Sequence, residues 1–204
     1  MMSTSTVRPP RLDSPPQEYR LGGPTVQVLD VIEQLLVASR HPDIVEVERY
    51  GPGQGPWGPT VEESRAKAIT GVMVRHQSSA TASLWEAVWP GEKPVEAPAA
   101  MPPIGRNRAP RLLILAAQLL DAAKPAAFTS WQLVALPNLG NPDTQPGLPA
   151  GISIVTSDGR KMLLRATATG PTVGVEPDDE PFSQYVIPEE VKTCLLPSAA
   201  AAGR

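Results

Sequence analysis

The sequence predicts an α+β protein with antiparallel sheets, built from two similar helix–strand–strand–strand units. Hydrophobic residues make up 41% of the 204 positions, which is enough for a folded core. The 25 prolines gather in stretches that separate short, regular segments. These segments follow the same order in both halves of the chain, first a helix and then strands. Together, the three observations favour an internally duplicated α+β fold.

Proline positions set the predicted domain boundaries, because proline fixes φ and lacks an N–H donor for helix interiors and central strands. The expected parts are a Pro-rich N-terminal arm (1–23), a first unit (24–91), a Pro-rich linker (92–108), a second unit (109–171) and an acidic, Pro-rich C-terminal tail with a short helix (172–204).

The first unit begins with a helix predicted over Pro24–Ser39, where apolar residues recur on one face and Pro42 follows the end. The alternating run Ile44–Tyr50 predicts a strand with one polar face. A short helix is expected from the capping-box spacing at Thr60 to Ile69. Two further strands follow, over residues 71–77 and 81–89.

The second unit repeats this order. A helix is predicted over Arg111–Ala123 and ends before Pro125. Strands are expected over residues 128–136, 151–156 and 161–168, the last two around an Asp-Gly turn that is typical of hairpins. A short helical run is expected after Pro188, over Val191–Leu196.

The two halves align at two constant spacings. Gly71-Val72 matches Gly151-Ile152 at a spacing of 80 residues, and Leu35-Leu36 matches Leu119-Leu120 at a spacing of 84. The difference falls in loops, where changes of length cost little. Chance alignment of two ordinary α+β stretches is the alternative.

The second helix is apolar almost all round, so it must be covered on most sides, by sheets or by a partner chain. The first helix has an ordinary polar face. Either a central position in one domain or an obligate oligomer accounts for this difference.

Candidate catalytic and metal-binding residues are few. His41 and His76 lack the spacing of a metal pair, and Cys194 reads as a buried structural thiol. The Gly51–Pro56 loop resembles a phosphate loop only in its glycines, since its prolines remove N–H donors. The acidic run 176–180 reads as a solvated surface or a contact for a basic partner. We therefore expect no catalytic, cofactor-binding or metal-binding residue.

The tryptophans are the candidate interface residues, because aromatic residues are scarce at 4% and tryptophan is enriched where proteins bind one another. They are Trp57, Trp85, Trp89 and Trp131. Packing in the core is the other use of these rings. Nucleic-acid binding is disfavoured by the net charge of −3 and because the one basic cluster, Arg106, Arg108 and Arg111, falls in the expected linker.

The sequence thus predicts a non-catalytic protein-interaction module, a structural or accessory component of a multiprotein assembly, bound to a protein partner or to copies of itself. The order of elements resembles the general topology of type III secretion chaperones. That resemblance implies an alternative, an adaptor such as a secretion-type chaperone or an immunity-like protein that binds one client. A small enzyme using scattered glutamates is a third possibility. No apolar stretch is long enough for a membrane helix and residues 1–10 are polar, so we expect a cytoplasmic protein, or one within a larger particle assembled there.

Overall fold

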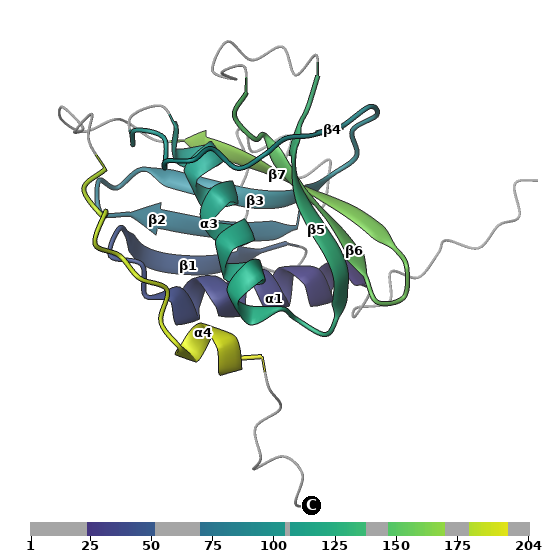
Figure 1. Cartoon of the computed structure of the whole chain (residues 1–204), viewed down its shortest axis with the longest axis horizontal. Helices are drawn as coiled ribbons and strands as arrows, with labels where there is room; N and C mark the ends of the chain where they lie inside the picture. The colour runs from purple at the N-terminus through teal and green to yellow at the C-terminus, as the bar shows by residue number, and fades with distance from the viewer. Residues whose placement is uncertain (1–23, 52–69, 105–106, 138–146, 170–179, 196–204) are drawn as a thin grey trace, which may run out of the picture.

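Seven antiparallel strands form one sheet in the order β1-β2-β3-β7-β6-β5-β4 (Figure 1). The computed structural model describes residues 24–51, 70–104, 107–137, 147–169 and 180–195. Its elements are α1 (Pro24–Ser39), β1 (Ile44–Tyr50), β2 (Gly71–His76), β3 (Thr81–Ala87), β4 (Lys93–Pro94), α3 (Arg108–Ala123), β5 (Phe128–Ala135), β6 (Gly151–Thr156), β7 (Lys161–Thr169) and α4 (Glu190–Thr193). The predicted α+β class is confirmed.

Both long helices pack on the same face of the sheet, and α4 lies against their ends (Figure 1). One large core lies between helices and sheet and includes Leu29, Leu84, Leu113 and Leu164, each 0% exposed. Helix α3 is buried nearly all round because it contacts four strands, α1 and α4. The chain itself therefore provides the cover that the apolar helix requires.

The observed elements lie close to their predicted bounds. The limits of α1, β1 and β6 agree with the sequence patterns, whereas β3 ends at Ala87, two residues before the expected Trp89. Helix α3 begins at Arg108 rather than Arg111 and includes Pro110 in its first turn. Proline is tolerated there because the N–H groups of the first turn have no acceptor within the helix. The helix expected over Thr60–Ile69 lies outside the described residues.

The elements of the two halves recur at constant spacings. Helices α1 and α3 both have 16 residues, and Arg108 stands 84 positions after Pro24. The register of β1 with β2 matches that of β5 with β6. Each paired residue of β5 stands 84 positions after its counterpart in β1, and each paired residue of β6 stands 80 positions after its counterpart in β2. Even the irregularity after Ile44 recurs after Phe128. The five residue pairs that join β2 to β3 all recur, 80 positions later, between β6 and β7.

The halves meet in the middle of the sheet, where β3 pairs with β7. Trp85 lies directly opposite Arg165, the residue 80 positions later. An approximate twofold axis relating the halves would therefore pass between these two residues.

Residues 92–108, expected as a linker, contribute to the sheet. Lys93 and Pro94 of β4 pair with Ala135 and Val134 of β5, and the Val95 N–H donates to the Leu133 carbonyl at 3.0 Å. The expected N-terminal arm (1–23) lies outside the described residues. Of the expected tail, residues 180–195 are described and pack against α1 and α3.

No helix in the described ranges is both long enough and apolar enough to cross a membrane.

Candidate functional site

Two of the four candidate tryptophans, Trp85 and Trp89, come together on the face of the sheet that α1 and α3 leave uncovered. Trp57 lies outside the described residues. Trp131 instead packs against the main core on the helical side, where its Nε1–H donates to Asp121 at 2.7 Å. The first candidate site is therefore formed by Trp85 and Trp89.

Arg165 of β7 lies close to both rings. Its guanidinium carbon is 5.3 Å from the Trp85 centroid and 5.9 Å from the Trp89 centroid. Both distances fall within the range of a cation–π interaction. Arg165 was not among the predicted site residues. The signal that could have identified it is its spacing, since it stands 80 positions after Trp85.

Hydrogen bonds and apolar contacts hold both tryptophans in place. The Trp85 Nε1–H donates to Thr167 Oγ1 at 3.2 Å, and the Trp89 Nε1–H donates to the Pro137 carbonyl at 3.0 Å. Trp89 also packs against a small cluster that includes Val134 and Leu163. The rings therefore present a fixed surface, which lowers the entropy lost on binding.

Arg165 has no ion-pair partner in the part of the chain that the structure describes. Its Nε is buried without a hydrogen-bond partner there, and burial lowers the pKa of the guanidinium. This surface, formed by Trp85, Trp89 and Arg165, is called the Trp–Arg surface below.

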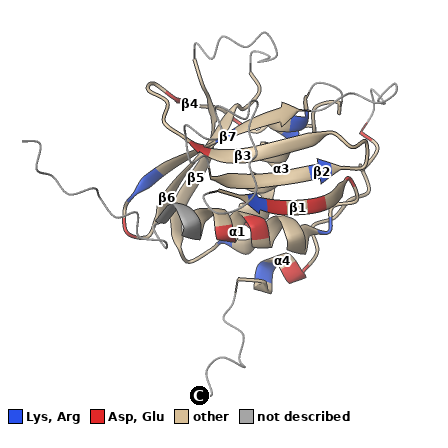
Figure 2. Ribbon diagram, turned by 180° about the vertical axis from the view of Figure 1, so that it is seen from behind, with Lys and Arg blue, Asp and Glu red and all other residues tan. Residues whose placement is uncertain are grey.

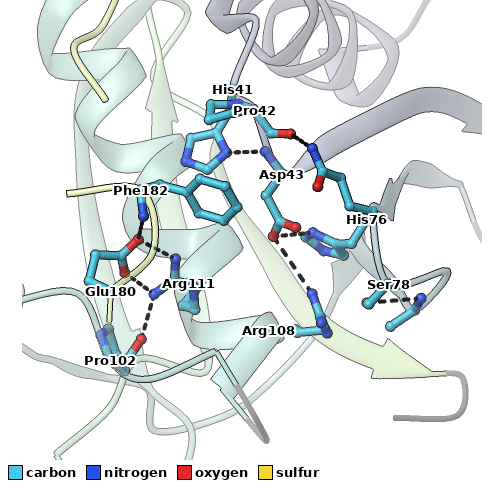
Figure 3. A network of polar contacts seen from close by, with 12 residues as sticks. His41, Pro42, Asp43, His76, Ser78, Pro102, Arg108, Arg111, Glu180 and Phe182 are labelled. Carbon is cyan, nitrogen blue, oxygen red and sulfur yellow. Dashed lines mark hydrogen bonds and ion pairs between the residues drawn. The ribbon is translucent and has the colours of Figure 1, made fainter. Parts of the chain in front are cut away.

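A second polar cluster lies buried on the helical side of the sheet (Figure 3). His76 Nδ1 lies 2.9 Å from Asp43 Oδ2, and Arg108 Nη1 lies 3.6 Å from the same oxygen. Burial raises the pKa of Asp43, but the hydrogen bond and charge of His76, with the charge of Arg108, outweigh it and lower the pKa overall. The carboxylate thus links β2 to the first turn of α3.

Arg111 joins the C-terminal segment to this cluster (Figure 3). Its guanidinium pairs with both oxygens of Glu180, with Nη2 at 3.0 Å from Oε1, and Nη1 also donates to the Pro102 carbonyl at 2.6 Å. The hydrogen bond from Arg111 lowers the pKa of Glu180. Arg108 and Arg111, expected in an exposed linker cluster, are thus buried in α3 beside carboxylates. Arg106 lies outside the described residues.

His41 lies at the junction of the two parts of the cluster. Its ring contacts Phe182 and Tyr185 with centroids 5.3 Å and 4.5 Å apart, and its Nδ1 accepts the Asp43 backbone N–H at 3.2 Å. Burial lowers the pKa of His41. One sequence pattern points to this cluster, because His76 is in phase with the buried Val72 and Val74 on β2.

The buried cluster joins β2, the first turn of α3 and the C-terminal segment, and the pocket beside it is small. The adjoining pocket, lined by His41, His76, Arg108 and Arg111, holds about 20 Å³, which is room for one water molecule. The described residues contain no group of three or more His, Cys, Asp or Glu suited to a metal ion. Cys194 is half-buried and its thiol lies 3.3 Å from the Val191 carbonyl. Burial raises its pKa, which disfavours the reactive thiolate.

The glutamates considered for an enzyme lie apart from this pocket. Glu46 pairs with Arg75 at 2.8 Å on the exposed face of β1, and Glu48 and Glu86 are exposed. Glu62 and Glu63 lie outside the described residues.

Comparison of the chain with protein-family models, with curated proteins and with solved structures gave no match.

Proposed function

We propose that this chain is a non-catalytic protein-interaction module that works as a structural or accessory component of a multiprotein assembly, in the cytoplasm or in a particle assembled there. The observation that carries the proposal is Arg165, a half-buried cation within cation–π distance of two hydrogen-bonded tryptophans. Tryptophan and arginine are the side chains that contribute most often to the energetic centre of protein interfaces.

The Trp–Arg surface suggests the chemistry of its partner. Arg165 would gain most from a carboxylate, because guanidinium and carboxylate form two parallel hydrogen bonds. The partly exposed rings of Trp85 and Trp89 add apolar contacts beside it. We therefore propose a protein partner that presents an Asp or Glu surrounded by apolar side chains.

An internal duplication accounts for the shape of this surface. The proposal rests on the matched registers, and on Gly71 and Gly151, which begin equivalent strands. A Cβ on Gly71 would lie 2.4 Å from the Leu84 carbonyl, and one on Gly151 would lie 3.0 Å from the Leu164 carbonyl. Close backbone approach requires glycine at both positions. Duplication would place the Trp–Arg surface on the axis between two copies of one unit.

The alternative is an adaptor, such as a secretion-type chaperone or an immunity-like protein, that binds one client. It rests on the order of the elements, and stoichiometry distinguishes it from a repeating assembly. A small enzyme is less well supported. The one His–carboxylate ion pair in the described ranges joins His76 to Asp43, and each of these residues is only 7% exposed.

Affinity purification of the full chain from its own cells tests the proposal, with the mass ratio of each co-purifying protein measured. We expect one protein, or further copies of this chain, at a fixed ratio. Arg165→Ala and Trp89→Ala should each reduce its recovery at least tenfold. Val186→Asp is the control, because Val186 is a largely exposed apolar residue, at 79%, in the separate segment 180–195. Equal recovery with all three variants would contradict the proposal, and a single client at fixed ratio would favour the adaptor.

A further inference from the structure

Strand β1 forms one edge of the sheet, and it differs from its counterpart β5 in what lies beside it. In the second half, the backbone of residues 93–95 covers the outer edge of β5. In the described part of the chain, β2 is the one strand that pairs with β1 (Figure 2). An exposed strand edge offers unpaired N–H and C=O groups to another chain.

The matched registers indicate which groups β1 offers. The Leu133 carbonyl points away from β6, since it accepts the Val95 N–H, whereas the Val134 carbonyl faces inward and accepts the Ala150 N–H. The residue equivalent to Leu133, at the spacing of 84, is Arg49. Alternation along a strand then places the N–H and C=O of Val47 and Arg49 on the outer edge.

The side chains of β1 indicate the chemistry of the incoming strand. Glu46 and Glu48 lie on the exposed face, where Arg75 pairs with Glu46. No ion pair involves Glu48 in the described ranges, so a positive side chain on the incoming strand would suit it. At the equivalent edge, beside β5, Val95 packs against the main core. The incoming strand should therefore carry an apolar residue one position before its basic residue.

These charges disfavour a second copy of the chain as the occupant. Antiparallel pairing of two β1 strands about Val47 would place Glu46 opposite Glu48 in both halves of the pair. Like charges directly opposite each other destabilise a strand pair.

We propose that the outer edge of β1 binds an extended segment of a partner protein, in which an apolar residue is followed by Lys or Arg. The segment adds an eighth strand by backbone hydrogen bonds to Val47 and Arg49, and its basic side chain pairs with Glu48. This edge is separate from the Trp–Arg surface, so an experiment can contradict binding at one of the two sites without affecting the proposal for the other.

A labelled synthetic peptide tests this proposal. The probe copies residues 91–98, the segment that covers β5, with Glu96→Lys so that the basic residue would lie beside Glu48 in the same register. Fluorescence anisotropy with the full chain should show saturable binding, at least fivefold tighter than that of the probe retaining Glu96. Amide hydrogen exchange at Val47 and Arg49 should slow when the probe binds.

A charge swap separates this pairing from general effects on folding. Glu48→Lys changes an exposed side chain, so it should weaken binding of the basic probe about fivefold and tighten binding of the acidic probe by a similar factor. Trp89→Ala should leave both affinities unchanged. No saturable binding, or binding indifferent to the charge swap, would overturn the proposal. Binding that appears only after deletion of residues 1–23 would also overturn it, because the chain itself would then occupy the edge.

Discussion

Ser79 and Gly159 occupy equivalent positions in the two hairpin turns. Their φ angles are 65° and 82°, and each N–H donates at 2.9 Å to the residue three positions before it. Glycine adopts positive φ without the steric cost of a Cβ. We therefore expect Ser79→Gly to raise the free energy of unfolding by about 0.5–1 kcal/mol, and Gly159→Ala to lower it by about 1 kcal/mol.

Urea denaturation of the unmodified chain, of Ser79→Gly and of Gly159→Ala measures these changes. Ser157→Gly is the control, because Ser157 lies in the second turn without a positive φ, so glycine there adds only flexibility to the unfolded chain. Ser157→Gly should leave stability unchanged or lower it slightly. If it stabilised the protein as Ser79→Gly is expected to, the effect would not come from the φ angle.

His41 should make stability depend on pH. Its folded pKa lies below that of the unfolded chain because burial penalises the charged ring. The unfolded state therefore binds more protons just below pH 6.5, and stability falls as the pH decreases through this range. In His41→Asn the amide oxygen can still accept the Asp43 N–H, and the loss of stability between pH 7 and pH 5.5 should become smaller. Denaturation midpoints at half-unit pH intervals test this, and an unchanged slope would contradict it.

At the residue scale, the conformation and contacts of a residue are best predicted from the sequence when they depend on its neighbours in the chain. Asp158-Gly159 identified its turn because Asp-Gly tolerates positive φ by itself, whereas Ser79 has no such preference. The contacts of His76 with Asp43 and of Arg111 with Glu180 join residues 33 and 69 positions apart, and only folding brings them together.

Residues 180–195 are held against α1 and α3 at several separate points. Glu180 pairs with Arg111, the Tyr185 hydroxyl donates to the Ser39 carbonyl at 2.8 Å, and Val191 is 0% exposed in the main core. The Arg111 side chain is 8% exposed, so loss of its partner leaves a poorly solvated charge.

Glu180→Gln should therefore lower the free energy of unfolding by about 1–3 kcal/mol and increase cleavage within residues 180–195 in limited proteolysis. Glu189→Gln is the matched control, because its pair with Lys192 is exposed and should contribute less than about 1 kcal/mol. Equal effects of the two variants would show that the buried pair does not hold the segment.

At the element scale, periodicity and proline predicted the two long helices and six of the strands closely, and for these elements the errors are confined to the ends. Lys93–Pro94 was missed as a strand because proline cannot donate to a ladder, yet it fits at the edge of the sheet, where its missing N–H need not join a ladder. Helix α4 has four residues, too few for a periodic pattern to fix its limits.

At the scale of the whole molecule, the sequence predicted the order of elements and their spacings of 80 and 84 residues, but not the contact between the halves. Pairing of β3 with β7 brings together residues about 80 positions apart, such as Leu84 and Ala166. Both strands have apolar helix-facing sides, and that pattern suits two separate sheets as well as one.

One shared sheet predicts one unfolding transition. Leu84 and Leu164 stand at equivalent places in the two central strands, each is 0% exposed, and both belong to the core that also contains α3. Leu84→Ala and Leu164→Ala should each lower the free energy of unfolding by about 2–5 kcal/mol, since each leaves a cavity that tight packing cannot close. Circular dichroism and tryptophan fluorescence should report the same shifted midpoint for both variants. Val37→Ala, at a side chain 58% exposed, should change stability by less than about 0.5 kcal/mol. Two separate transitions, with Leu84→Ala shifting only one of them, would mean that the halves fold as independent units despite the strands that join them.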